Sequence, residues 1–433
     1  MATKLTTERL AIDGGPRAVP EGAIPYVGHG VAELDAAEEA AVLDVLRRKA
    51  VFRWQDAEQS YVARFEDAFA RRLGARYALA VNSGTGALVT ALTAAGIGPG
   101  DEVIVPGYTF IASAAAVILC GAVPVIAEID DTLTLDPDDV ARKLTPSTRA
   151  IMPVHMRGIP SQMDRLMAIA AERNLLVVED TAQCNGGSFG GRATGTIGHL
   201  GCFSLQASKT MTAGEGGVVV TDDPQLYARA ALGHDSAMAF WRKLSADHDL
   251  RLGDVPPFAG NGYRMSELQG AVAYSQLGKL DGIIATMRRR KREILQATTG
   301  APGLRLLRVP DPAGECALSI NYLLDTAEQA QRFAKALQAE GVRVGTIHNE
   351  GFPDRHIYRY WDYVLHKTPI APGRDPWRDP RYRGHVEYAP DMCPRTLDIL
   401  SRTAAVLLNQ RMAEAHSALI AGAIHKVARA LFG

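Results

Sequence analysis

"YALAVNSGTGALVTALTAAGIGPGDEVIVPG", residues 77–107, is the stretch of the chain that decides its fold. A short apolar run opens it, a helix-forming run follows at residues 84–97, and a second apolar run closes it at residues 101–107. This order predicts a strand, a helix and a second strand. Strands that are apolar along nearly their whole length are typical of a parallel sheet covered on both faces.

The same alternation extends in both directions from this stretch. Two helices with apolar residues at helical spacing are predicted before it, at residues 33–49 and 61–74. Strands and helices are predicted to alternate after it, at residues 109–121, 123–130, 137–145, 149–155, 163–174 and 175–180. The first half of the chain therefore reads as one doubly covered α/β domain.

The strand signal fades after about residue 222. Residues 266–299 read as one long helix or two in succession, and a second strand and helix are predicted at residues 317–325 and 327–342. A stretch rich in proline and charge, residues 368–385, reads as an insertion loop. The tail is predicted to be helical over residues 396–409 and 412–432.

Composition excludes several classes of function. The 47 basic and 48 acidic residues of this 433-residue chain nearly cancel, so nothing favours nucleic acid or an anionic membrane as the partner. No apolar run is long enough to cross a bilayer, and the N-terminus lacks the apolar core of a signal peptide. The cysteines are scattered and form no CxxC pair, which predicts a cytoplasmic protein without a zinc site or a disulfide framework: Cys120, Cys184, Cys202, Cys316 and Cys393.

Two predicted strand ends carry polar residues suited to a ligand. Ser83, Gly84 and Thr85 join a strand to a helix, where free backbone N–H groups and hydroxyls form an anion site; an ordinary capped helix is the alternative. Asp180 closes an apolar strand, at the edge where an open α/β sheet binds its ligand. A carboxylate there either keeps a heteroaromatic nitrogen protonated or caps a helix.

Two further segments complete a pattern. Lys209 lies in "FSLQASKTMTAGEGG", five residues after Ser204 and before a tight Gly-Glu-Gly-Gly turn that lets the backbone approach the amine. Phe110 follows another strand end and either stacks on a flat ring or belongs to the core. An anion cradle, a carboxylate, an aromatic ring and a lysine together match pyridoxal phosphate, which alternates with pyridoxamine phosphate during amino transfer. Lys209 would form the Schiff base and then move the proton.

At this point the chain resembles the DegT/DnrJ/EryC/StrS group of sugar and cyclitol aminotransferases. The resemblance rests on "FEDAFARRLGARYALAVNSGTGAL", "GDEVIVPGYTFIASAAAVILCGAVPV", "VHMRGIPSQMD", "VVEDTAQ", "FSLQASKTMTAGEGG" and "GYRMSELQGAVAYSQLGKLD". It implies an α/β protein with the type I aminotransferase fold. This fold has a large, mainly parallel domain, expected at residues 22–290, and a smaller C-terminal domain, expected at residues 291–433. The N-terminal arm, residues 1–21, is expected to belong with the smaller domain. It also implies a homodimer with active sites at the subunit interface.

The resemblance assigns roles to the residues already singled out. It makes Lys209 the Schiff-base lysine and Asp180 the partner of the pyridine nitrogen. It adds Gln183 as a contact of the ring hydroxyl. Related enzymes that carry histidine in place of the lysine dehydrate sugars, so Lys209 argues for amino transfer. The remaining cofactor contacts it implies are the stacking ring and the phosphate cradle: Phe110, Ser83, Gly84, Thr85 and Ser204.

The chain departs from the family pattern at one position. The family often places asparagine directly before Tyr-Arg, where the neighbouring subunit uses it on the cofactor phosphate. Here that position is Gly262, in "GNGYRMSE". Either Asn261, one residue earlier, takes over the contact, or the contact is lost.

The wording of the motifs looks closer to the cyclitol branch, the scyllo-inosose aminotransferases and aminohydroxybenzoate synthases, than to the nucleotide-sugar branch. The resemblance implies L-glutamine or L-glutamate as amino donor and a small keto compound as acceptor. His155 and Arg157 lie at a strand end and either contact substrate or serve the structure. The aromatic and basic segment 348–367 forms either part of the acceptor pocket or a solvated loop.

Other functions are left open at this point. A nicotinamide dehydrogenase needs a glycine fingerprint after its first strand, but "GGSFGG", residues 186–191, has the wrong spacing and comes late. An aminotransferase for nucleotide-linked keto-sugars, a pyridoxal phosphate enzyme with another reaction, and a non-catalytic regulatory relative remain as alternatives. The intact lysine, aspartate and glutamine argue against the last of these.

Overall fold

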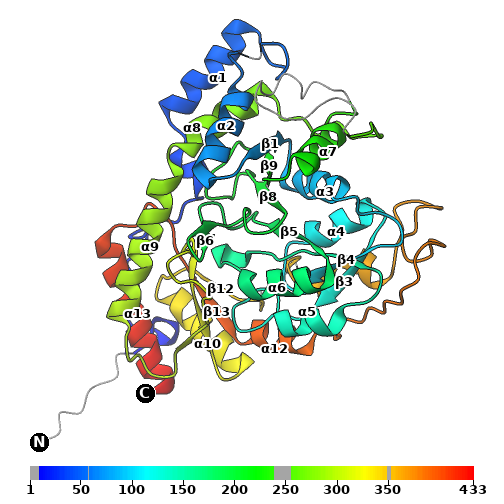
Figure 1. Ribbon diagram of the computed structural model, residues 1–433. Coiled ribbons are helices and arrows are strands. Elements are labelled where there is room, and N and C mark those ends of the chain that lie inside the picture. Colours follow the sequence, from blue (N-terminus) through cyan, green and yellow to red (C-terminus); the bar gives the residue numbers. More distant parts are fainter. Residues whose placement is uncertain (1–8, 57, 238–254, 349–352) are drawn as a thin grey trace, which may run out of the picture.

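A computed structural model describes residues 9–56, 58–237, 255–348 and 353–433 of the chain (Figure 1). Its centre is a sheet of seven strands in the order β1-β9-β8-β5-β4-β2-β3. The strands from β8 to β3 are parallel to their neighbours, and β9 is antiparallel to both β1 and β8. Their bounds are Tyr77–Val81 (β1), Glu102–Pro106 (β2), Val123–Ala127 (β3), Thr148–Ile151 (β4), Leu176–Asp180 (β5), Leu200–Ser204 (β8) and Gly217–Thr221 (β9).

Helices cover both faces of this sheet, which confirms the predicted α/β arrangement. Alternate side chains of one strand enter different cores: Leu79 packs with α3, α4 and α7, whereas Ala80 packs with α2, α8 and α9. Helices α5 and α6 cover the rest of the second face. The bounds are Ala36–Arg48 (α1), Tyr61–Leu73 (α2), Gly84–Ala94 (α3), Ala112–Leu119 (α4), Pro137–Lys143 (α5), Met163–Arg173 (α6), Pro224–His234 (α7), Glu267–Leu277 (α8) and Leu280–Ala297 (α9).

A second, smaller sheet is antiparallel, in the order β10-β11-β13-β12. Helices α10 and α13 pack against it, together with the described part of the N-terminal arm. Glu340 holds that arm by accepting hydrogen bonds from the backbone N–H groups of Ala11 (2.8 Å) and Ala18 (2.7 Å). The bounds are Arg305–Leu306 (β10), Ser319–Leu323 (β11), Val344–Gly345 (β12), Thr403–Leu407 (β13), Ala327–Ala339 (α10), Pro394–Ser401 (α12) and Glu414–Phe432 (α13).

The prediction of a helix over residues 396–409 was wrong for its second half. Helix α12 ends at Ser401, and "TAAVL" then forms β13 in the middle of the small sheet. Ala405 of this strand pairs with Asn321 of β11 and with Gly345 of β12. Pairing on both edges outweighs the helix propensity of alanine and leucine, because propensity is a weak local preference that tertiary contacts override.

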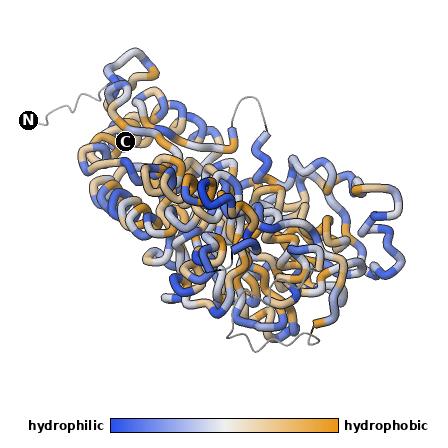
Figure 2. The backbone as a smooth tube through the Cα atoms, turned by 90° about the horizontal axis from the view of Figure 1, so that it is seen from above, coloured by the Kyte–Doolittle hydropathy of each residue, from blue (hydrophilic) through white to orange (hydrophobic). Residues whose placement is uncertain are grey.

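Residues 353–393 leave the small sheet and pack back onto the large one (Figure 1, orange). Tyr358 and Trp361 are fully buried in the core that also contains β1, β2 and α3. The predicted insertion 368–385 contains no helix or strand, and Figure 2 shows its outer part as hydrophilic. It is nevertheless tied to the sheet edge, because Tyr382 donates a hydrogen bond to Glu102 of β2 (2.6 Å).

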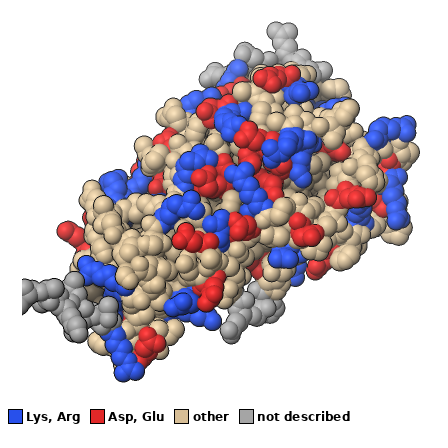
Figure 3. Space-filling view, turned by 90° about the horizontal axis from the view of Figure 1, so that it is seen from below, with Lys and Arg blue, Asp and Glu red and all other residues tan. Residues whose placement is uncertain are grey.

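The predicted domain boundary at residue 290 falls inside helix α9, so the division into residues 22–290 and 291–433 stays a prediction. Among the described residues, none of the helices is long and apolar enough to cross a membrane. Acidic and basic side chains are interspersed on the face seen in Figure 3, in keeping with the net charge of −1.

Candidate active site

The carboxyl ends of β2, β5 and β8 and the N-terminus of α3 enclose a cavity of about 450 Å³. An open α/β sheet binds its ligand at this edge. The cavity is lined by eight residues that the sequence analysis singled out: Ser83, Gly84, Thr85, Phe110, Asp180, Gln183, Ser204 and Lys209.

The N-terminus of α3 forms one end of the cavity. Ser83 caps the helix, since its Oγ accepts a hydrogen bond from the N–H of Gly86 (2.9 Å). The first N–H groups of a helix have no acceptor within the helix, so those of Gly84 and Thr85 are available to a ligand. A Cβ at Gly84 would lie only 2.8 Å from Cβ of Ser204. Glycine therefore lets Ser204 approach the helix N-terminus and complete a pocket suited to an anion.

Asp180, the last residue of β5, lies deep in the cavity and is 4% exposed. Its carboxylate accepts hydrogen bonds from Oγ of Ser113 (2.8 Å) and from the N–H of Ala182 (3.1 Å). Burial raises the pKa of Asp180 above its usual value, and these hydrogen bonds and the charge of Lys209 only partly oppose that rise. A cationic N–H group of a ligand would supply the missing compensation.

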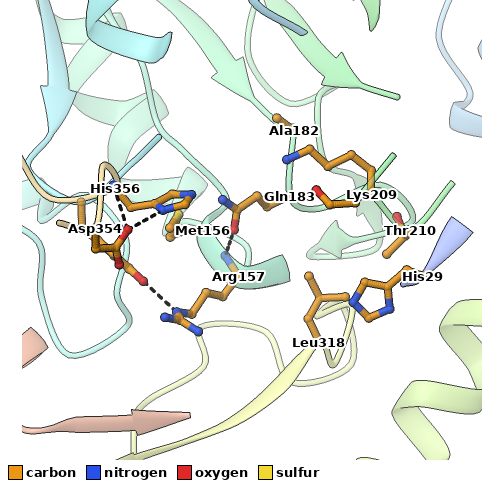
Figure 4. A pocket seen from close by; sticks show the side chains of 12 residues that line it. His29, Met156, Arg157, Ala182, Gln183, Lys209, Thr210, Leu318, Asp354 and His356 are labelled. Carbon is orange, nitrogen blue, oxygen red and sulfur yellow. Dashed lines mark hydrogen bonds and ion pairs between the residues drawn. The ribbon is translucent and has the colours of Figure 1, made fainter. Parts of the chain in front are cut away.

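Lys209 lies in the turn between β8 and β9, with its side chain directed toward Ala182 and Gln183 (Figure 4). Burial lowers the pKa of its amine, although the carboxylates of Asp180 and Glu215 act in the opposite direction. A lowered pKa makes the neutral, nucleophilic form of the amine available closer to neutral pH. The backbone of Lys209 is held in turn by Gly30, whose N–H donates to its carbonyl (2.8 Å).

Phe110 and Gln183 supply a flat apolar surface and an amide. The ring of Phe110 is 49% exposed, although it follows a buried strand, so one face is open to the cavity. Oε1 of Gln183 accepts a hydrogen bond from the N–H of Arg157 (3.1 Å), which leaves the amide NH₂ group as the donor toward a ligand. Both arrangements suit a planar heteroaromatic ring that carries a hydroxyl group.

A second cavity, of about 430 Å³, adjoins the first and shares Gln183 and Lys209 with it (Figure 4). Arg157 lines this cavity, and its Nε donates a hydrogen bond to the hydroxyl of Tyr108 (2.8 Å). No ion pair joins Arg157 to a carboxylate among the described residues. Its guanidinium group is therefore placed to receive an anionic group of a substrate.

Of the two roles predicted for His155, a substrate contact or a structural one, its surroundings favour the structural one. His155 is fully buried and lies on neither cavity. Its Nδ1 accepts a hydrogen bond from the N–H of Ser161 (3.0 Å), and its Nε2 is 2.8 Å from Oε2 of the buried Glu179. Because both ring nitrogens are bound within the protein, His155 serves the structure and joins β5 to the loop after β4.

Asn261 is not part of the cavity in a single chain. It is exposed, and its backbone bonds to Gly233 (2.7 Å) and Ser236 (2.9 Å). A Cβ built at the neighbouring Gly262 meets no atom within 4 Å. The role of Asn261 on a cofactor phosphate stays a prediction, since it depends on a second subunit.

The lining of the second cavity includes His29, which sequence reasoning did not single out, and Asp354 and His356, which lie in the segment offered as part of an acceptor pocket. Asp354 and His356 belong to the segment 348–367, which packs against the protein; residues 349–352 of that segment lie outside the described residues. Gln410 holds His29 by donating a hydrogen bond to its carbonyl (2.7 Å). His29 lies far from Lys209 in sequence, so no local pattern relates the two.

Comparison with known proteins adds an independent finding. Residues 33–371 match the DegT/DnrJ/EryC1/StrS aminotransferase family. The chain is 38% identical to L-glutamine:2-deoxy-scyllo-inosose aminotransferase of Streptomyces kanamyceticus, over 70% of each chain. It is 34% identical to L-glutamine:scyllo-inosose aminotransferase of Streptomyces griseus, over 76% of this chain and 78% of that protein. It is also 37% identical to GDP-perosamine synthase of Caulobacter vibrioides, over 61% of this chain and 68% of that protein.

Solved structures give the same picture. The fold superposes on 3-amino-5-hydroxybenzoic acid synthase with a TM-score of 0.75 at 28% identity, covering 93% of this chain and 99% of the other. It superposes on an aminotransferase of Psychrobacter cryohalolentis with a TM-score of 0.76 at 26% identity, covering 94% and 100%.

Proposed function

The chain belongs to the DegT/DnrJ/EryC1/StrS aminotransferase family, and from this premise we propose that it is a pyridoxal-phosphate-dependent enzyme of amino transfer to a keto-cyclitol. The amino donor is L-glutamine or L-glutamate. One observation carries the proposal: Lys209 and Asp180 share a cavity with the N-terminus of α3, the half-buried amine with a lowered pKa and the buried carboxyl with a raised pKa.

The residues of the cavity fit the cofactor. Ser204 and the N-terminus of α3 would bind its phosphate, and Phe110 would stack on its ring. Asp180 would keep a proton on the ring nitrogen. The positive charge of that nitrogen would then stabilise the buried carboxylate of Asp180. Gln183 would donate a hydrogen bond to the ring hydroxyl.

When bound, pyridoxal phosphate supplies an electron-withdrawing ring that stabilises negative charge on the carbon beside the transferred nitrogen. Lys209 would hold the cofactor between turnovers. Its Nζ, when free, would be the base that carries the proton from the donor α-carbon. Arg157, on the wall shared with Gln183, binds the donor carboxylate.

The extent of the similarity supports a cyclitol as the acceptor. The two inosose aminotransferases match 70% and 76% of the chain, whereas the GDP-perosamine synthase matches 61% at nearly the same identity. A nucleotide-linked keto-sugar is the second candidate acceptor. The similarity of the chain to GDP-perosamine synthase is the observation that favours this candidate.

We also propose a cytoplasmic homodimer whose interface completes each site. Exposed large apolar side chains gather in one part of the sequence: Val27, Val31, Leu34, Leu43, Leu46, Val51 and Phe52. Such groups on a soluble protein are typical of a contact surface. All five cysteines are free, which suits a reducing compartment.

The two half-reactions test the proposal separately. The protein loaded with pyridoxal phosphate is mixed with L-glutamine, L-glutamate or L-alanine, and the visible spectrum reports conversion of the cofactor. The aminated form is then mixed with scyllo-inosose, 2-deoxy-scyllo-inosose or a GDP-linked 4-keto-sugar. We expect conversion by glutamine or glutamate and return of the spectrum with an inosose. No conversion with any donor would overturn the proposal in favour of a regulatory protein or another reaction.

A further inference from the structure

His356 occupies a fixed position beside the predicted cofactor-stacking ring. Its carbonyl accepts a hydrogen bond from the N–H of Thr109 (2.9 Å), and Tyr358 donates to the carbonyl of Gly107 (3.0 Å). These contacts align the segment with the end of β2, as an antiparallel bridge between Tyr108 and Ile357. The ring centroid of His356 lies 5.4 Å from that of Phe110.

Asp354 determines which nitrogen of His356 carries the proton. Oδ1 of Asp354 accepts hydrogen bonds from the backbone N–H of His356 (3.0 Å) and from its Nδ1 (2.7 Å). Burial raises the pKa of Asp354, but the side-chain hydrogen bond and the charge interaction with His356, followed by its backbone N–H and the charge of Arg157, outweigh burial and hold that pKa below its usual value. An ionised carboxylate accepts only, so Nδ1 is the donor, and whenever the ring is neutral its Nε2 is an acceptor.

Nε2 faces the substrate side of the site. The side chain of His356 is 34% exposed and lines both the cofactor cavity and the second cavity. Figure 4 shows its ring beside Asp354, across the drawn cavity from Lys209. No hydrogen bond to Nε2 is formed by the part of the protein that the structure describes.

We propose that His356, positioned by Asp354, is a substrate-binding residue whose Nε2 accepts a hydrogen bond from a ring hydroxyl of the acceptor. This role rests on the proposed function. It requires that the keto substrate, which accepts the amino group, is a cyclic ketone that bears hydroxyl groups. The donor carboxylate cannot fill this role, because it has no hydrogen to give and would face the carboxylate of Asp354. A polyhydroxylated ring has several hydroxyls that can donate.

Two variants and two matched controls test the pair. His356→Gln removes the imidazole acceptor. Asp354→Ala removes the acceptor of Nδ1, so the ring is no longer held with its proton on Nδ1. His366→Gln and Asp362→Ala make the same changes within the same segment, where both side chains are exposed and line neither cavity.

We expect both test variants to lose about 3- to 10-fold in kcat/KM for scyllo-inosose, the cost of one neutral hydrogen bond. The loss should appear in KM more than in kcat. The donor half-reaction with L-glutamine should be unchanged, and both controls should match the wild type. An equal loss in the donor half-reaction would overturn the inference, since it would place the amide of glutamine, or the cofactor, on Nε2.

A substrate series separates a direct contact from a structural role. Inososes that each lack one hydroxyl are assayed with the wild type and with His356→Gln. One of these hydroxyls should donate the hydrogen bond that Nε2 accepts. Its removal should lower kcat/KM of the wild type several-fold and that of the variant almost not at all, because the effects of changing two groups in contact are not additive. Additive losses for every hydroxyl would overturn the inference. A wild type that no donor converts would overturn the proposed function, and this inference with it.

Discussion

Lys209 and Asp180 have shifted pKa values for the same physical reason. Burial disfavours the charged form of each, so the pKa of the amine falls and that of the carboxyl rises. Each charge also partly offsets the shift of the other. The two residues therefore form a coupled pair, and changing one alters the protonation of the other.

The first prediction concerns Lys209. Lys209→Ala removes the amine that we propose both holds the cofactor and moves the proton, so turnover should fall by several orders of magnitude. The visible absorption of the lysine-bound cofactor should disappear. Lys335→Ala, at an exposed position in α10, is the control and should behave as wild type. A Lys209→Ala protein that keeps both its spectrum and its rate would contradict the assignment.

The second prediction concerns Asp180 and pH. The carboxylate of Asp180 raises the pKa of Lys209, against the larger lowering by burial. Asp180→Asn removes that charge, so the pKa of Lys209 should fall further and its neutral amine should form at lower pH. The rate of cofactor loading, measured against pH, should have its midpoint at lower pH in this variant than in the wild type. An unchanged midpoint would show that the carboxyl carries no charge beside the amine.

The same residue should matter for turnover. Asp180→Ala leaves the ring nitrogen without a partner, so the donor half-reaction should slow strongly, whereas Asp180→Glu should keep part of the rate. Equal rates for Asp180→Ala and wild type would argue against the pairing with the ring nitrogen.

Residue types and motifs predicted most of the cavity lining but could not predict the direction of each side chain. Lys209 and Gln183 face the cavity, whereas His155, near the same edge of the sheet, points into the core. Successive side chains of an extended segment point in opposite directions, so a shift of one residue decides whether a side chain faces the cavity or the core. His29 could not be predicted because only the tertiary fold brings it to Lys209, whereas His356 belongs to the segment 348–367 that the sequence offered as part of an acceptor pocket.

At the scale of elements, the start of α3 depends on a residue without a side chain. Gly84→Ala would place a Cβ 2.8 Å from that of Ser204 and push the two apart. We expect weaker cofactor binding in a titration and a free energy of unfolding lower by about 1–3 kcal/mol, the usual cost of overpacking.

Gly422→Ala in α13 is the matched control for this prediction. A Cβ there meets nothing within 4 Å, so this helical substitution should stabilise the protein by about 0.4–1 kcal/mol and leave cofactor binding unchanged. Equal effects of the two substitutions would show that the contact with Ser204 is unimportant.

The parallel strands from β2 to β5 were predictable because each lies between turn signals and a helix, whereas the parallel strand β8 was not among the predicted strands. Strand β13 was not, because "TAAVL" is short and rich in residues that favour helices. Its conformation depends on β11 and β12, which lie far away in sequence. Strand pairing between distant segments is the information that local patterns lack.

At the scale of the whole molecule, the departure at Gly262 gives a further prediction. If Asn261 reaches the cofactor phosphate of a partner subunit, Asn261→Ala should weaken cofactor retention by about 1.5–3 kcal/mol, the value of a hydrogen bond to a charged group. Gly262→Asn restores the family residue at a position with open space, and should tighten retention. Cofactor titration of the three proteins measures both effects.

The control for this prediction is the oligomeric state of the wild type and of the two variants. Sedimentation should give a dimer for the wild type and for both variants, since neither position removes an apolar contact. A monomer that transfers amino groups at the full rate would contradict a site shared between subunits.

The contacts that residues 29 and 30 make with Gln410 and Lys209 depend on the order in which the chain is synthesised. Gly30 donates to the carbonyl of Lys209, and Gln410 holds the carbonyl of the adjacent His29. A ribosome adds Gln410 to the chain 381 residues after His29. Because earlier parts of a chain can fold before later parts are made, residues 29 and 30 have both contacts only after Gln410 has been added. The nascent large sheet can therefore form well before the segment over Lys209 is held at both of these points.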